Sequence, residues 1–156
     1  MIYQTKLSAF LRQKFVLDWD GIHGAKHWAR VKRLGRYLGA EHGADLEVVT
    51  LFALMHDSCR EDEDRDIEHG SRASLLVREM NGVLYGINDF QENQLAFACE
   101  GHSHGGMSHD ITIQVCWDAD RLDLGRLAIQ PDPRRLGTET AQRLSAERWP
   151  YERVGR

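Results

Sequence analysis

The 156-residue chain contains little proline and no long hydrophobic run. Its three prolines, Pro131, Pro133 and Pro150, all lie late in the chain, so the preceding residues contain no obligatory helix breaker. No apolar stretch approaches the roughly 20 residues that a membrane span needs, and the N-terminus lacks the apolar block and cleavage site of a signal peptide. We therefore expect a helical, cytoplasmic protein with no membrane partner.

Cysteine is also scarce, and there is no excess of positive charge. The three cysteines are odd in number and show no CxxC spacing, which excludes a disulfide framework and a zinc ribbon. With 20 basic and 24 acidic residues, the formal net charge of −4 gives no general attraction to nucleic-acid phosphates. We expect reduced thiols and no nucleic-acid groove.

The composition is that of a packed globular domain, with 42% hydrophobic and 28% charged residues. The length suits one domain over residues 1–156. Branched residues show no sustained period-2 alternation, whereas apolar residues recur at helical spacing. The sequence therefore predicts an all-α fold, with helices over about 6–15, 24–42, 45–58, 71–80, 89–100, 111–127 and 138–149.

Local signals predict where some of these helices end and which side they bury. Gly43 stands where a left-handed cap would end the second helix, and Asp45 is a suitable N-cap for the third. In the sixth helix, Ile111, Val115 and Leu122 recur at helical spacing. We expect these three side chains to face the core.

Histidine is abundant, with eight residues. Six of them fall at expected helix ends or in loops beside acidic residues, where such clusters bind metals or protons: His23, His27, His56, His69, His102 and His104. The adjacent pair His56-Asp57 ends an apolar helix, where side chains of the last turn can leave the core. A histidine is also favourable at the negative end of a helix dipole without any function, so the pair alone does not indicate a site. The surrounding motifs must distinguish the two interpretations.

Three elements occur in order: His27 before WARV, His56-Asp57 after FALM, and Asp120 within DADRLD. In this order the residues resemble the HD-domain superfamily of metal-dependent phosphohydrolases, with its H…HD…D pattern. The resemblance covers about residues 20–127, including the stretches IHGAKHWARV, FALMHDSC, EHGSRAS and DADRLD. It implies a bundle of about six to seven helices, with residues 128–156 as a C-terminal extension.

The resemblance further implies that one divalent metal ion is bound by His27, His56, Asp57 and Asp120. Two imidazoles and two carboxylates exclude a soft thiolate site and suit Mn, Fe, Co, Ni, Mg or Zn. Four protein ligands on an octahedral ion leave two positions for water and a substrate oxygen. Asp118 is then interpreted as supporting the ligands or facing solvent.

Several other residues are expected to serve the substrate or a second ion. His69, with His102 or His104, could bind a second metal ion, because the order of histidines here resembles the H…HD…H…H…D pattern of two-metal HD proteins. The alternative is that these histidines line the pocket. The expected substrate-binding set is His23, Lys26, Arg30, His69, His102, His104 and Arg121. Arg30 and Arg121 are alternatively interpreted as partners of nearby carboxylates.

The acidic segment after the HD pair is expected to contain the catalytic groups. HD hydrolases place a water-activating carboxylate shortly after HD, and Glu61 and Asp62 are the nearest candidates, one or two residues further along than in the family. Arg60 occupies an expected acidic position and could grip a phosphate through its planar fork. The alternative for residues 61–66 is a solvated surface turn.

These features together predict a metal-dependent phosphohydrolase that acts on a small phosphate ester, expected to be a nucleotide, through metal-activated water. Two alternatives stay open. One is a di-iron oxygenase on the same fold, which shares the extra histidines, and the other is a non-catalytic module that binds a metal or a nucleotide. The sequence is compatible with an oligomer.

Overall fold

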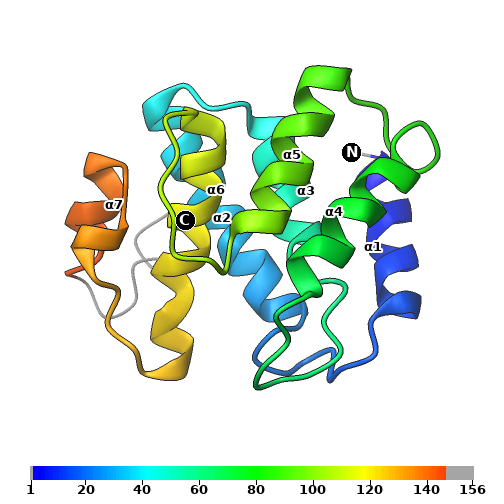
Figure 1. Cartoon of the computed structure of the whole chain (residues 1–156), viewed down its shortest axis with the longest axis horizontal. Helices are drawn as coiled ribbons and strands as arrows, with labels where there is room; N and C mark the ends of the chain where they lie inside the picture. Colours follow the sequence, from blue (N-terminus) through cyan, green and yellow to red (C-terminus); the bar gives the residue numbers. More distant parts are fainter. Residues whose placement is uncertain (1, 147–156) are drawn as a thin grey trace.

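The computed structural model describes residues 2–146, which form helices joined by loops, with no strand in that range (Figure 1). The α-helices are α1 (Ile2–Lys14), α2 (Ala25–His42), α3 (Leu46–Met55), α4 (His69–Met80), α5 (Asp89–Gly101), α6 (Ile111–Leu122) and α7 (Glu139–Leu144). Two short 3-10 helices, η1 (Asp123–Leu127) and η2 (Pro133–Arg135), follow α6. The all-α prediction is confirmed. Within this range, no helix is both long and apolar enough to cross a membrane.

The centre of the bundle is formed by α2, α3, α5 and α6, and α4 packs on α5. Figure 1 shows α1 and α7 at opposite ends of the long axis. Between the central helices the side chains of Leu34, Leu38, Phe52, Leu95 and Val115 are fully buried. Each contributes about 1.5–3 kcal/mol to stability. This packing fixes the ends of α2, α3 and α6, where the polar motifs lie.

The junction of α2 and α3 has the predicted caps. Gly43 adopts a left-handed conformation with φ of 72°, and its N–H donates to the carbonyl of Gly39. The carboxylate of Asp45 accepts hydrogen bonds from the first backbone N–H groups of α3. Because the turn is tight and α3 packs along α2, the end of α3 lies beside the beginning of α2.

Several helix boundaries differ from the prediction, and the third helix ends at Met55 rather than at residue 58. The fourth helix begins at His69 rather than at residue 71, because Gly70 packs directly on the backbone of α5. A Cβ atom at Gly70 would lie only 2.7 Å from the carbonyl oxygen of Cys99. The sixth helix ends at Leu122, and the chain tightens into η1 instead of continuing as one helix to residue 127.

The two ends of the chain also differ from the prediction. Residues 2–14 form the first helix, which therefore begins before the expected residue 6. Ile111, predicted to face the core, is 39% exposed because it is the first residue of α6, whereas Val115 and Leu122 are buried as expected. The last described helix ends at Leu144, and the predicted extension beyond residue 146 lies outside the described residues.

Candidate metal centre

The structure brings together the four predicted metal ligands, which come from three helices. His27 lies in the first turn of α2, His56 and Asp57 follow the last turn of α3, and Asp120 lies near the end of α6. The Nε2 atom of His27 is 3.0 Å from Nε2 of His56, 3.4 Å from Oδ2 of Asp57 and 3.3 Å from Oδ1 of Asp120. Both imidazoles are fully buried. We call His27 and His56 the first histidine pair.

The hydrogen bonds of the first pair fix which nitrogen faces the centre. Nδ1 of His27 donates to Oδ2 of Asp123 at 2.7 Å, and Nδ1 of His56 donates to the carbonyl of Phe52 at 3.1 Å. In a neutral imidazole that donates from Nδ1, Nε2 carries a lone pair. Two such lone pairs face each other across 3.0 Å, and this contact is favourable only with a cation, a proton or a metal ion, between them.

A second histidine pair repeats this arrangement. Nε2 of His69 lies 2.9 Å from Nε2 of His102. Their Nδ1 atoms donate to the backbone carbonyls of Asp66 and Cys99. Oδ1 of Asp57 lies 3.3 Å from Nε2 of His69 and 3.4 Å from Nε2 of His102. The two oxygens of Asp57 therefore face the two histidine pairs.

The donor set fits divalent metal ions. Donor atoms of the first pair and its carboxylates are 3.0–3.6 Å apart, as are neighbouring ligands around an ion with bonds of about 2.0–2.2 Å. Three overlapping groups of histidine and aspartate in the described part of the chain could hold a metal ion. These groups combine neutral imidazole nitrogen with carboxylate oxygen, which suits Mn, Fe, Co, Ni or Zn.

The imidazoles and carboxylates of this cluster shift one another's pKa values. Burial alone would raise the pKa of Asp57 and Asp120, but the surrounding imidazoles hold the pKa of both carboxylates well below the usual range. Burial disfavours the charged form of His27, yet the carboxylates of Asp120, Asp123 and Asp57 outweigh it and raise the pKa of His27 to about 10. In the metal-free protein, a proton on His27 thus takes the place of the metal ion.

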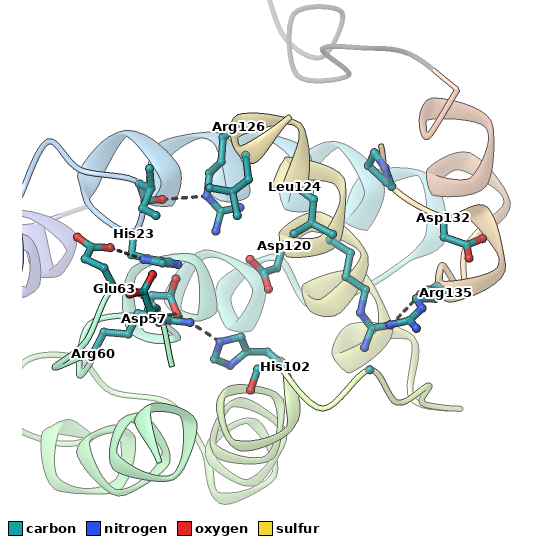
Figure 2. Close-up of a pocket in the computed structure, with 17 residues that line it drawn as sticks. His23, Asp57, Arg60, Glu63, His102, Asp120, Leu124, Arg126, Asp132 and Arg135 are labelled. Carbon is teal, nitrogen blue, oxygen red and sulfur yellow. Dashed lines mark hydrogen bonds and ion pairs between the residues drawn. The ribbon is translucent and has the colours of Figure 1, made fainter. Parts of the chain in front are cut away.

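A cavity of about 550 Å³ opens onto this cluster (Figure 2). Asp57, His102 and Asp120 line it on one side, and Leu124, Leu127 and Pro131 add apolar surface. Arginines also line it: Arg60, Arg121, Arg126 and Arg135. The cavity can therefore hold a small molecule that is partly apolar and carries negative charge.

Of the predicted catalytic residues, the structure brings one to the cavity. Nε of Arg60 donates to Oδ1 of Asp57 at 3.1 Å, and Arg60 lines the cavity. Glu61 is exposed, and its Oε1 lies 3.7 Å from Nε of Arg72. The carboxylate of Asp62 accepts hydrogen bonds from the backbone of Asp64 and Arg65, so it stabilises its own turn. Neither Glu61 nor Asp62 lines the cavity.

The predicted substrate-binding residues divide in the same way. His23, His102 and Arg121 line the cavity, and His69 lies behind His102. Three others lie away from it: Lys26, Arg30 and His104. Lys26 is exposed beside Asp20, and the guanidinium of Arg30 forms a two-pronged contact with Asp123 at 2.7 and 3.0 Å. His104 is exposed in the loop after α5.

Sequence reasoning missed Glu63 and Asp123. Oε2 of Glu63 lies 2.6 Å from Nδ1 of His23, and both residues line the cavity. The fully buried carboxylate of Asp123 orients His27 and binds Arg30. A signal for Asp123 exists in the sequence, because it follows Asp120 by three residues and so lies one turn further along the same face. Glu63 has no comparable signal within its acidic run.

Asp118 neither supports the metal ligands nor faces solvent, contrary to its interpretation from the sequence. It is fully buried and accepts hydrogen bonds from Nε2 of Gln114, the backbone N–H groups of Gly137 and Thr138, and the hydroxyl of Thr138. Asp118 therefore attaches the segment after η2 to α6.

No protein-family model and no curated protein matches the chain. Among solved structures, it is similar to the crystal structure of a predicted HD superfamily hydrolase from an uncultured Thermotogales bacterium. The sequences are 21% identical, the match covers 96% of this chain and 87% of that chain, and the TM-score is 0.76. The chain has the HD-domain fold. Within its HD-domain fold, the buried histidines and aspartates described above could hold a metal.

Proposed function

We propose that the protein is a metal-dependent hydrolase of small phosphate esters, with nucleotides as the expected substrates. The observation that carries this proposal is that two histidine pairs face the two oxygens of Asp57 beside an arginine-lined cavity. His27, His56, Asp57 and Asp120 would hold one ion, and His69, His102 and Asp57 a second. Bound divalent ions supply an acidified water and neutralise charge on a phosphoryl oxygen.

We further propose that His23 and Glu63 handle the proton of the attacking water. Glu63 contacts Nδ1 of His23 at 2.6 Å, which leaves Nε2 of this cavity-lining ring to accept the proton of the water. Burial lowers the pKa of His23 even though Glu63 opposes this, so the ring is neutral at pH 7 and can accept a proton. His23 thus replaces Glu61 and Asp62 as the proposed general base.

Hydrolysis of the ester also requires that the metal ligands and the substrate are held in position. A bond forms between the water oxygen and phosphorus, the ester P–O bond breaks, and the departing alkoxide takes up the proton that His23 accepted from the water. Arg60, which donates to Asp57, orients this carboxylate. The apolar side chains Leu124 and Leu127 would contact the organic part of the ester.

The test is phosphate release from a panel of nucleotides and other phosphate esters, with Mn²⁺, Mg²⁺, Co²⁺, Ni²⁺, Zn²⁺ or Fe²⁺ added to protein freed of metal by a chelator. We expect metal-dependent turnover that is lost in Asp57→Ala. His109→Ala is the matched control, because His109 is exposed in the loop before α6 and should leave turnover unchanged. Absence of turnover with every ester and metal would contradict the proposal.

The second histidine pair also favours one other candidate, a di-iron oxygenase. Two buried imidazole pairs that share Asp57 could hold two irons. Elemental analysis of protein purified without a histidine tag distinguishes the candidates. Two irons per chain, with an optical band that changes when O₂ is admitted, would favour the oxygenase. A colourless metal with phosphate release would favour the hydrolase.

A further inference from the structure

The cavity has a second polar end, away from the metal ligands. In Figure 2, Arg135 and Asp132 lie on the opposite side of Asp120 from His23 and Glu63. Arg135 comes from η2, and Arg121 from α6 donates to its carbonyl oxygen at 2.8 Å. Leu124, between Asp120 and Arg135 in this view, adds apolar surface to the same cavity.

Arg121 is a buried cation whose direct contacts are all with neutral groups, including the ring of Trp117, while Asp118 and Asp120 attract it only from a longer distance. Its side chain lines the cavity although the residue is only 8% exposed, and it donates to the carbonyls of Gly106 at 2.6 Å and Arg135 at 2.8 Å. Both acceptors are neutral. Within residues 2–146, Arg121 forms no ion pair within 4 Å, and neither does Arg135. A buried guanidinium is stabilised most by an anion, so this end of the cavity favours one.

Of the five carboxylates that line the cavity, Asp64 is exposed and the other four contact other groups. Asp57 and Asp120 face the histidine pairs, and Glu63 contacts His23. Asp132 forms an ion pair with Arg134 at 2.9 Å, and Arg134 points out to solvent with a side chain that is 88% exposed. Within the described residues, Arg121 and Arg135 therefore feel carboxylates only at longer range, Asp118 and Asp120 on Arg121 and Asp132 on Arg135, and neither is in a direct ion pair.

The segment that carries Arg135 is held in place. Asp118 accepts hydrogen bonds from the backbone N–H groups of Gly137 and Thr138, two and three residues after Arg135. Arg121 holds the carbonyl of Arg135 from the same helix. The Arg135 backbone is thus fixed relative to Asp120, which lies between Asp118 and Arg121 in the sequence. The guanidinium of Arg121 is held by the carbonyls of Gly106 and Arg135, and a cation held near the metal ligands can select ligands by length.

We propose that Arg121 and Arg135 form an anion subsite, and that the substrate carries a second anionic group, a phosphate or a carboxylate, apart from the ester phosphate that is hydrolysed. This inference rests on the proposed function for the position of the ester phosphate. The substrate class is then a small ester with negative charge at both ends and an apolar or sugar-like body between them.

The test uses phosphonates, whose C–P bond is not hydrolysed, so that binding is measured without turnover. The full-length protein is loaded with Mn²⁺, and calorimetry compares alkylphosphonates with phosphonoalkanoates and alkane diphosphonates of two to five methylene groups. At the best length, we expect the second anionic group to tighten binding about tenfold. The larger gain, from carboxylate or from phosphonate, identifies the group that the subsite takes.

Matched variants assign the effect to the subsite. Arg135→Gln should abolish the preference for two anionic groups, and the side chain is exposed, so folding is not at risk. Arg143→Gln is the control, because Arg143 is an exposed arginine of α7 that does not line the cavity, and it should keep the preference. The proposal is overturned if one and two anionic groups bind equally, if no phosphonate binds, or if the preference survives Arg135→Gln.

The outcomes separate the two proposals. A preference that depends on Arg135 in a protein that hydrolyses no phosphate ester would support the subsite and contradict the proposed function. Hydrolysis of esters by a protein that shows no such preference would support the function and overturn the subsite.

Discussion

Asp118 and Asp120 lie two residues apart on α6 but serve different parts of the molecule. Asp120 faces His27 and His56, whereas Asp118 binds the backbone at Gly137 and Thr138. Residues at i and i+2 point to nearly opposite sides of a helix. One helix therefore holds a proposed metal ligand on one side and attaches a wall of the cavity on the other. A second Asp in the same motif therefore need not have the same role as the first.

The largest expected effect comes from breaking the Asp120 side. Asp120→Ala removes a carboxylate that faces both imidazoles of the first histidine pair. We expect loss of metal from that pair and a fall in phosphate release of about 100-fold or more, since even outer contacts of metal ligands cost about 10- to 100-fold. Metal content and phosphate release, measured on the same preparation, check this. Full metal content in the variant would contradict it.

Breaking the Asp118 side should instead reduce stability. Asp118→Ala leaves the N–H groups of Gly137 and Thr138 without their acceptor, and we expect the free energy of unfolding to fall by about 3 kcal/mol. Urea denaturation in the presence of a chelator measures it. Metal bound per folded chain should equal that of the wild type. If Asp118→Ala loses metal while it remains folded, the two carboxylates are not separate in function.

The two histidine pairs allow a finer comparison. His102→Ala should reduce metal per chain from two to one, because His102 faces both His69 and Asp57. His104→Ala should retain two, because His104 is exposed. Elemental analysis of both variants beside the wild type decides. Equal loss of metal in the two variants would indicate that His104 also binds the metal.

The smallest expected effect is the release of a proton when metal binds to the first histidine pair. In the metal-free protein the pKa of His27 is about 10, so at pH 8 this imidazole is protonated, whereas a metal ligand must be neutral. Metal binding at pH 8 should therefore release about one proton from the first pair. The release should vanish as the pH rises above the pKa of His27. Calorimetry in buffers of different ionisation enthalpy measures it, and Asp118→Asn should leave it unchanged.

Local signals in the sequence were sufficient for most of the fold. Helical periodicity and the caps Gly43 and Asp45 place α2 and α3, and these two helices set His27 beside His56. The beginning of α4 could not be predicted in this way, because glycine disfavours helices. Gly70 is helical only because it allows α4 to contact the backbone of α5, a contact between residues far apart in the chain.

The candidate site shows the same limit at the level of single side chains. In the acidic run, Asp62 turns the backbone through bonds to Asp64 and Arg65, and Glu63 then contacts His23. Composition cannot rank neighbouring carboxylates whose direction depends on such a turn. Likewise, His102 is selected over His104 by its bond to the carbonyl of Cys99, one turn earlier.

The position of Asp57 has a mechanical consequence. One of its oxygens faces histidines from α2 and the end of α3, and the other faces histidines from α4 and the end of α5. Ions bound on both sides would cross-link four helices through a single side chain. Loading the centre would then fasten the α4 and α5 hairpin to the rest of the bundle, and unloading would remove these metal bonds while the packing, the hydrogen bonds and the contacts of Asp57 with His69 and His102 remain.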